Sequence, residues 1–231
     1  MSREDFTPQH KAIGRISAFA VFFIGVVYGV ILVLGFLSLK SPQDPIGDPF
    51  LSILEILIVI MAPLMVVSMV AVHAYAFAEV KAYSLTALVF MILLAGLTSS
   101  VHFVILTVSR QIEASGFTMA PLFFSFKWPS VAYTLDILAW DFFFALSMLF
   151  AAPVFKEGRL EKALRILMIV SGVLSLMGLI GVPLADMGVS NWFIYRNIGV
   201  VGYAVVAPVA FLLLGIIFER TRKLPLPNRR P

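Results

Sequence analysis

The sequence contains no cysteine, only three histidines, and few charged residues, which make up 13% of its 231 positions. Without cysteine the chain forms no disulfide, no thiolate metal site and no cysteine nucleophile. A soluble domain of ordinary composition carries about 25% charged and about 45–50% apolar residues. Here 61% of the residues are apolar, which is more than a water-soluble core of this size can bury. We therefore expect the surplus apolar surface to face lipid.

Sequence motifs of several common enzyme classes are absent as well. There is no Gly-x-x-x-x-Gly-Lys-Ser/Thr phosphate loop, no His-Glu-x-x-His zinc motif and no Gly-x-Ser-x-Gly nucleophile elbow. His73 and His102, the two histidines inside apolar runs, are expected at opposite leaflets, so we predict no metal centre and no cofactor. The net charge of +4 comes from basic residues beside apolar runs, which indicates a lipid bilayer as partner and not nucleic acid.

Six apolar runs are each long enough to cross a bilayer, which takes roughly 20 residues in a helix. They cover residues 13–39, 50–78, 82–109, 130–155, 163–185 and 192–218. We predict an all-α fold, in which residues 1–223 form a single bundle of six transmembrane helices. We expect the basic, proline-containing tail at 224–231 to be disordered.

The basic residues predict an orientation for these spans. Thirteen of the 17 Lys and Arg residues fall on the side that holds both termini, and four fall on the other side, namely Lys40, Arg110, Lys127 and Arg196. Cytoplasmic loops carry an excess of Lys and Arg. We therefore predict a multi-pass protein of the cell membrane with both termini in the cytoplasm.

Ionisable side chains inside the spans are the strongest candidates for function, because they are costly in lipid and usually face the bundle interior. At 1.5 Å per helical residue, most of them fall in the outer half of the membrane under this orientation. They are Glu55, His102, Asp136, Asp141, Asp186 and Arg196. Such clustering predicts either an outward-opening polar cavity or a buried ion-pair network. The candidate cavity residues are Glu55, Ser99, His102, Asp136, Trp140, Asp141, Arg196 and Asn197.

Helical spacing adds detail to this cluster. Thr98, Ser99 and His102 share one helix face, whereas Asp141 lies about 140° around its helix from Asp136. The two aspartates are therefore not expected to form a carboxylate pair. Arg196 and Asp186 flank a short turn, and we expect them to form an ion pair at the membrane surface.

The longest loop, residues 110–129, contains several aromatic residues and Lys127. Aromatic and basic side chains suit the membrane–water boundary. The sequence leaves two interpretations of this loop open: a segment that lies on the outer surface, or a lid over the cavity.

The region from Leu138 to Gly181 resembles a known family of membrane proteins. It contains an aromatic-rich span, a short basic turn at Lys156–Arg159 and a span with spaced small residues. These features are similar to the fourth and fifth spans of DUF4386, a family of bacterial six-span proteins of unknown function. The proline-arginine expected in the basic turn is absent, and Leu164-Arg165 stands nearby without the proline. The resemblance implies a prokaryotic inner-membrane protein and assigns a role to no residue.

Three functions remain open from the sequence. The first is the binding or transport of a small molecule or ion through the polar cavity. The second is an intramembrane enzyme acting on a lipid or isoprenoid, with His102 as acid or base and Asp136 or Asp141 orienting it. The third is a partner-binding subunit that exposes a small-residue stripe, Gly172, Ser175 and Gly178–Leu179, to lipid. The absence of catalytic motifs favours the non-enzymatic functions, and the oligomeric state stays undetermined.

Overall fold

The computed structural model describes residues 6–41, 44–126, 128–186 and 192–221. Over these ranges every regular element is a helix, so the predicted all-α class is confirmed. The tail at 224–231, for which we expected disorder, lies outside the described residues.

Six helical stretches are long and apolar enough to cross a membrane, as predicted. They are Pro8–Leu37, Phe50–Tyr75, Ala78–Ser109, Val131–Val154, Gly158–Pro183 and Ile194–Arg220. The first two spans are the single helices α1 (Pro8–Leu37) and α2 (Phe50–Tyr75). The third span joins a short 3-10 turn to α3 (Lys81–Val104) and a π-helical segment, η2 (Ile105–Ser109). This protein is therefore a membrane-spanning helical bundle.

The last three spans each combine several helical elements. The fourth runs through α6 (Val131–Ile137), the π-helical η3 (Leu138–Phe144) and α7 (Ala145–Ala151). The fifth is α8 (Gly158–Gly178), followed by α9 (Gly181–Asp186). The sixth consists of α10 (Trp192–Val200), the π-helical η5 (Val201–Val206) and α11 (Ala207–Arg220).

The fifth span begins five residues earlier than the apolar run that starts at Ala163. Glu161 lies inside the first turn of α8, and its Oε2 accepts hydrogen bonds from the backbone nitrogens of Lys156 and Glu157 at 2.9 and 2.8 Å. The hydroxyl of Tyr75 donates to its other oxygen at 2.6 Å. A carboxylate satisfies free amides at a helix start, so the helix extends into the polar turn.

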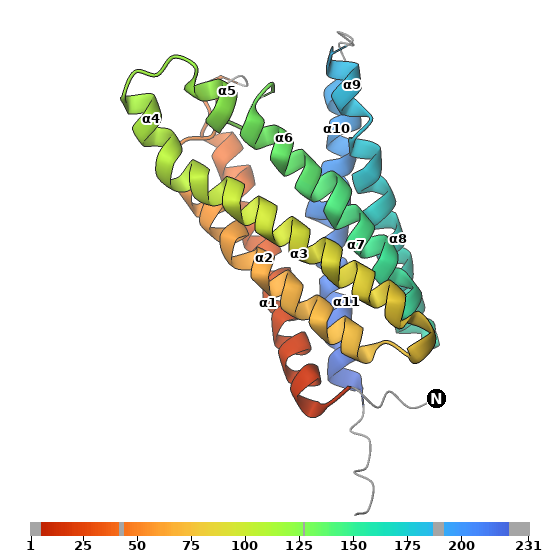
Figure 1. Ribbon diagram of the computed structural model, residues 1–231. Helices are drawn as coiled ribbons and strands as arrows, with labels where there is room; N and C mark the ends of the chain where they lie inside the picture. Colours follow the sequence, from red (N-terminus) through yellow and green to blue (C-terminus); the bar gives the residue numbers. More distant parts are fainter. Residues whose placement is uncertain (1–5, 42–43, 127, 187–191, 222–231) are drawn as a thin grey trace, which may run out of the picture.

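The first and last spans bring the described chain ends to one end of the bundle, which we call the terminal end. Lys11 Nζ donates to the carbonyl of Thr221 at 2.7 Å, and Arg15 lies 3.5 Å from Glu219. The opposite end, which we call the loop end, carries the short helices α4 (Arg110–Ala114) and α5 (Ala120–Phe124), as Figure 1 shows. An even number of spans follows, while the cytoplasmic location of the terminal end stays a prediction.

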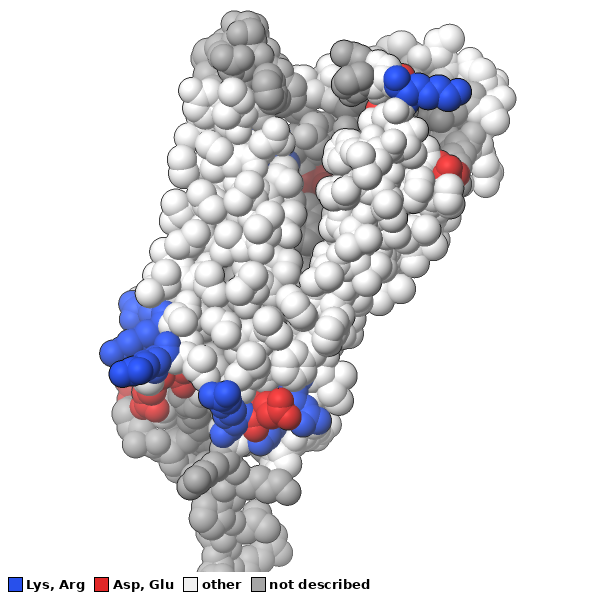
Figure 2. Space-filling view, turned by 180° about the vertical axis from the view of Figure 1, so that it is seen from behind, with Lys and Arg blue, Asp and Glu red and all other residues white. Residues whose placement is uncertain are grey.

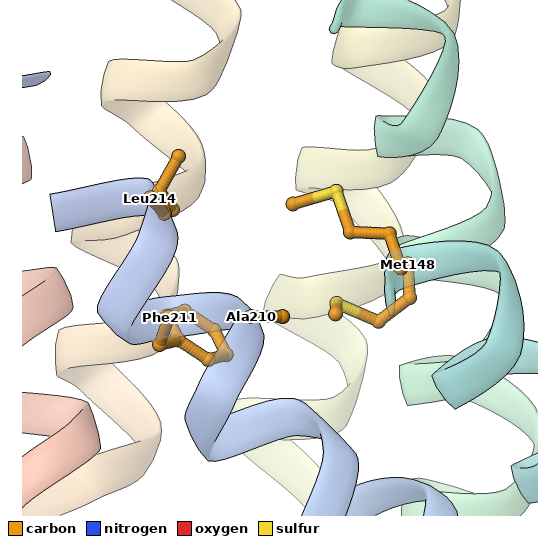
Figure 3. A pocket seen from close by; sticks show the side chains of 5 residues that line it. Met148, Ala210, Phe211 and Leu214 are labelled. Atoms are coloured by element: carbon orange, nitrogen blue, oxygen red, sulfur yellow. The ribbon is translucent and has the colours of Figure 1, made fainter. Parts of the chain in front are cut away.

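The terminal half of the bundle is packed tightly with apolar side chains. Met148, Met168, Ala210, Phe211 and Leu214 meet where α7, α8 and α11 come together, and Figure 3 shows their side chains directed into one small space. This space has no room for a water molecule. The terminal half is therefore closed in this conformation.

The loop between the third and fourth spans covers the loop end of α3. Phe124 and Phe126 pack against Val101, Ile105 and Ala132. Other apolar side chains of this loop are exposed, namely Phe117, Met119, Leu122 and Phe123. The loop thus has one apolar side on the bundle and a second apolar side directed outward, which suits a segment at the membrane surface.

Candidate functional site

A buried histidine lies between two carboxylates from different helices in the loop half. His102 Nδ1 of α3 is 2.6 Å from Glu55 Oε2 of α2, and His102 Nε2 is 3.4 Å from Asp136 Oδ1 of α6. The Glu55 and His102 side chains are 2% and 7% exposed, and that of Asp136 is 15% exposed. We call these three residues the histidine triad. They belong to three of the five spans in which the sequence predicted costly ionisable groups.

The triad extends through hydrogen bonds into the fourth span. Thr98 donates to Asp136 Oδ1 at 3.0 Å, and the indole nitrogen of Trp140 donates to the Thr98 hydroxyl at 3.0 Å. Thr98 and His102 are four residues apart on α3, so they present adjacent side chains on one face. Both contact Asp136, which fixes the position of this carboxylate from two sides.

A second charged pair lies one turn further into the bundle. Arg196 Nη1 of α10 donates to Asp141 Oδ2 of η3, and Arg196 Nη2 donates to the Tyr203 hydroxyl at 3.3 Å. The Arg196 guanidinium also lies 5.8 Å from the Tyr133 ring centre. The ring of Tyr203 packs 5.2 Å from that of Trp140. The ion pair and the histidine triad are therefore neighbouring parts of one group, which we call the polar cluster.

Glycines allow α8 and α10 to approach each other beside this ion pair. A Cβ on Gly178 would lie 2.8 Å from Gly199 Cα and 2.9 Å from Asp141 Oδ2. A Cβ on Gly202 would lie 2.7 Å from the carbonyl oxygen of Ser171 and 2.7 Å from the Ser175 hydroxyl. Only glycine fits at such contacts, which is the usual reason for small residues between membrane helices.

The small-residue stripe of the fifth span therefore lies in the bundle interior and not on a lipid-facing surface as expected. Gly172, Ser175 and Gly178 are buried inside the bundle and do not face lipid. Ser171 donates a hydrogen bond to the carbonyl of Gly202 at 2.8 Å, which ties the stripe to the sixth span. The expectation of a lipid-exposed stripe was wrong because two other spans of the same chain cover it: the sixth packs on Ser175 and Gly178, and the fourth packs on Gly172.

Three π-helical segments adjoin the polar cluster. η3 contains Trp140 and Asp141, η5 contains Tyr203, and η2 begins three residues after His102. π-helical turns are rare and occur frequently at functional sites. Asp136 contacts His102 and Asp141 contacts Arg196, in keeping with the expectation that the two aspartates would not pair with each other.

The structure gathers most of the candidate residues and separates two of them. Glu55, His102, Asp136, Trp140, Asp141 and Arg196 belong to the polar cluster. Ser99 is half-buried, and its neighbour Thr98 is the hydroxyl that contacts Asp136. Asn197 lies on the exposed side of α10. Arg196 pairs with Asp141, and the side chain of its expected partner, Asp186, lies outside the described residues.

The candidate residues did not include the tyrosines near the cluster, although Tyr133 shares a helix face with Asp136 and Trp140. Tyr133 and Tyr203 contact Arg196, and Tyr28 of α1 lies within electrostatic range of Asp136 and Glu55. In the sequence, these residues could have been recognised as tyrosines that lie inside apolar runs. A buried tyrosine hydroxyl normally finds a polar partner, so it marks a polar neighbourhood.

A cleft leads toward the polar cluster from the side of the bundle. α1 meets α11 at three levels, where Gly14 approaches Phe218, Gly215 approaches Phe19 and Gly25 approaches Pro208. Toward the loop end this seam stops, and Val201 and Val205 of η5 are 44% and 61% exposed. Figure 1 shows α1 and α10 diverging there, and Figure 2 shows a cleft in the upper half of this face with acidic and basic atoms at its bottom.

Several buried polar atoms of the cluster have no hydrogen-bond partner among the residues that the structure describes. They are His102 Nε2, Asp141 Oδ1, Arg196 Nε and Ser175 Oγ. Buried polar atoms in native proteins are nearly always hydrogen-bonded to protein or water. These atoms therefore mark where the cluster can accept a further polar group.

The cluster does not have the geometry of a metal centre. Within the described part of the chain, no three His, Asp or Glu side chains are placed to hold one ion. In the triad the two carboxylates contact opposite nitrogens of one ring, so their oxygens do not converge on a point beside the imidazole.

Comparisons with protein-family models, with curated proteins and with solved structures gave no match. The resemblance of residues 138–181 to the DUF4386 family therefore stays a prediction. The functional argument depends on the geometry of the polar cluster.

Proposed function

We propose that this protein binds a small molecule or ion at the polar cluster and carries it across the membrane. The observation that supports this most directly is that the carboxylate of Asp136 is partly exposed although it lies inside the bundle. Asp136, 15% exposed, is joined to buried His102 and Glu55, and Figure 2 shows acidic and basic atoms at the bottom of the cleft. Charged groups at membrane depth are costly and typically mark ligand or ion pathways.

The asymmetry of the bundle supports transport in particular. The loop half has a cleft and charged residues, whereas the terminal half is closed by Met148, Phe211 and Leu214. Transporters present a site alternately to each side of the membrane. The structure would then correspond to a state closed at the terminal end, and the glycine contacts between α8 and α10 offer a smooth surface for movement.

A purely structural network fits only part of the cluster. Asp141 and Arg196 are paired and buried, as a structural ion pair would be. Asp136 differs, because among the described residues it has no Lys or Arg partner and His102 is its only basic neighbour. A network that served stability alone would not leave His102 Nε2 without a hydrogen bond.

An intramembrane enzyme is the second candidate function, and the triad favours it specifically. His102 lies within direct reach of both Glu55 and Asp136, which is the arrangement by which a carboxylate orients a general base. A lipid or isoprenoid could reach it from the side of the bundle. Turnover of such a substrate, abolished in His102→Gln, would distinguish catalysis from transport.

Cysteine labelling tests the central claim, because the natural sequence supplies a cysteine-free background. In proteoliposomes, Asp136→Cys should react with a charged, membrane-impermeant thiol reagent, whereas Met148→Cys, fully buried in the terminal half, should not. Equal protection of both cysteines would mean that the cluster is closed to solvent, and it would contradict a binding site.

A further inference from the structure

We propose that the ligand is a protonated amine with an apolar body, which enters sideways through the cleft between α1 and η5 and binds at Asp136. This inference rests on the proposed function and names its substrate class. It combines the hydrogen-bond chemistry of the triad, the arrangement of aromatic rings and the apolar walls of the cleft.

When His102 is neutral and holds its proton on Nδ1, Nε2 and Asp136 Oδ1 are two neighbouring acceptors; a protonated His102 instead donates from Nε2 to Asp136. When His102 Nδ1 donates to Glu55, with which it makes the 2.6 Å contact, the ring nitrogen Nε2 carries a lone pair. Nε2 has no hydrogen-bond partner among the described residues, and it lies 3.4 Å from Asp136 Oδ1. An ammonium group has three donors and one positive charge. It can donate to both atoms and neutralise the carboxylate.

Both terminal nitrogens of Arg196, the cationic side chain of the cluster, are engaged, and only its buried Nε is unpartnered among the described residues, which disfavours an anionic ligand. Arg196 is held by Asp141 and Tyr203. Gly178 and Gly199 pack directly against the same guanidinium, where an added Cβ would lie 3.0 and 3.2 Å from Nη1. Arg196 cannot turn toward the cleft without losing these contacts. The group that remains available to a ligand is a carboxylate.

Aromatic rings pack around the histidine triad on the side of His102. Phe126 packs 5.1 Å from the His102 ring, and Tyr133 lies 6.5 Å from Phe126. The faces of aromatic rings attract cations when the centroid lies within about 6 Å. Such rings stabilise an organic cation and also contact its apolar portion.

The walls of the cleft suit an apolar body rather than a hydrated ion. Val201 and Val205 are exposed on η5 where α1 turns away beyond Gly25. The route from the loop end is restricted, because Phe124 and Phe126 pack on Val101 and Ala132 above the triad. A ligand that partitions into the bilayer can therefore reach Asp136 from the side.

Binding of radiolabelled 2-phenylethylamine to the protein in nanodiscs tests this inference. We expect saturable binding that unlabelled amine displaces and that 2-phenylethanol and ammonium chloride displace at least tenfold less well. Asp136→Asn should weaken binding at least tenfold and Asp136→Glu should partly retain it. Val205→Trp, which narrows the cleft far from the charges, should weaken it severalfold. Glu219→Gln removes a carboxylate at the terminal end and should bind like the wild type. Size-exclusion profiles verify that each variant is folded.

The other possible outcomes contradict separate parts of the proposal. If ammonium competes as well as the amine, or if Val205→Trp binds like the wild type, the apolar, lateral ligand is wrong. If no amine binds while Asp136→Cys is still labelled from water, the inference fails and the proposed function stands. If amine binding and labelling are both absent, both fail.

Discussion

Gly178 of α8 and Gly199 of α10 touch directly beside the ion pair of Asp141 and Arg196. A Cβ on Gly199 would lie 2.9 Å from Gly178 Cα and 2.8 Å from Asp141 Oδ1. The two glycines therefore let the fifth and sixth spans close over a buried charge pair. The stability of the loop half depends on this contact.

We expect Gly199→Ala to destabilise the protein by about 1–3 kcal/mol, the usual range for an over-packed interior. The added methyl group would separate α8 from α10 or displace Asp141. Thermal unfolding in detergent would show a lower midpoint. The matched control is Gly96→Ala on α3, where an added Cβ meets no atom within 4 Å. An unchanged midpoint for Gly199→Ala would show that the helices can adjust without cost.

Breaking the buried ion pair should cost more than replacing both partners. Asp141→Leu or Arg196→Met leaves one buried charge without its partner, which typically costs about 3–5 kcal/mol. The double variant removes both charges and should recover much of that loss. A double-mutant cycle by thermal or denaturant unfolding measures the coupling between the two residues.

The surface pair Arg15–Glu219 gives the reference for this cycle. Both side chains are about half exposed, and exposed ion pairs contribute about 0–1 kcal/mol. Equal coupling energies at the two sites would mean that the Asp141–Arg196 pair is solvated in the membrane.

Thr98→Val should weaken ligand binding and also lower stability by about 1–3 kcal/mol, because the buried Trp140 N–H loses its acceptor. Its hydroxyl donates to Asp136 and accepts from Trp140, so the valine leaves Asp136 less well positioned. The net value of one hydrogen bond, about 1 kcal/mol, corresponds to a roughly fivefold loss of affinity. Thr86→Val is the control, because the Thr86 hydroxyl bonds only its own helix at Ala82. Unaltered affinity in Thr98→Val would remove Thr98 from the site.

The predicted orientation has its own test. In intact cells, Asp44→Cys on the loop side should react with a membrane-impermeant thiol reagent, and Glu157→Cys at the terminal end should react only after permeabilisation. This follows from the excess of basic residues at the terminal end, where Figure 2 shows most of the Lys and Arg atoms of that face. The reverse pattern would place both termini outside and would turn the site toward the cytoplasm.

Hydropathy and turn chemistry were sufficient to predict the six spans, and the bounds agree to within a few residues at most ends. The first and fifth spans each begin five residues earlier than predicted. At the start of the fifth span, Glu161 caps backbone amides that no apolar pattern reveals. Because charged residues are rare inside the spans, the few that occur there could be identified from the sequence as candidates for function. Asp136 and Asp141 stood out because a carboxylate in a membrane span requires a partner.

The partners themselves could not be predicted from the sequence. The α-helical wheel placed Ser99 and Asn197 in the cluster, yet Asn197 is exposed and Thr98 is the residue that contacts Asp136. Arg196 was expected to pair with Asp186 across a short turn; the structure shows its contact with Asp141 of a different span, which the sequence did not indicate, and the side chain of Asp186 lies outside the described residues. The π-helical segments change the direction of Trp140, Asp141 and Tyr203, and nothing in the local sequence marks them.

The sequence by itself determined that this chain crosses a membrane six times and that its ionisable residues gather toward one end, because the cost of exposing polar groups to lipid acts on each helix separately. The tertiary structure decided which of these residues meet. Helix rotation and crossing, set by contacts such as Gly178–Gly199 and Gly25–Pro208, place His102 between two carboxylates and leave a cleft beside Val205. These relations depend on packing between distant segments, which no local pattern encodes.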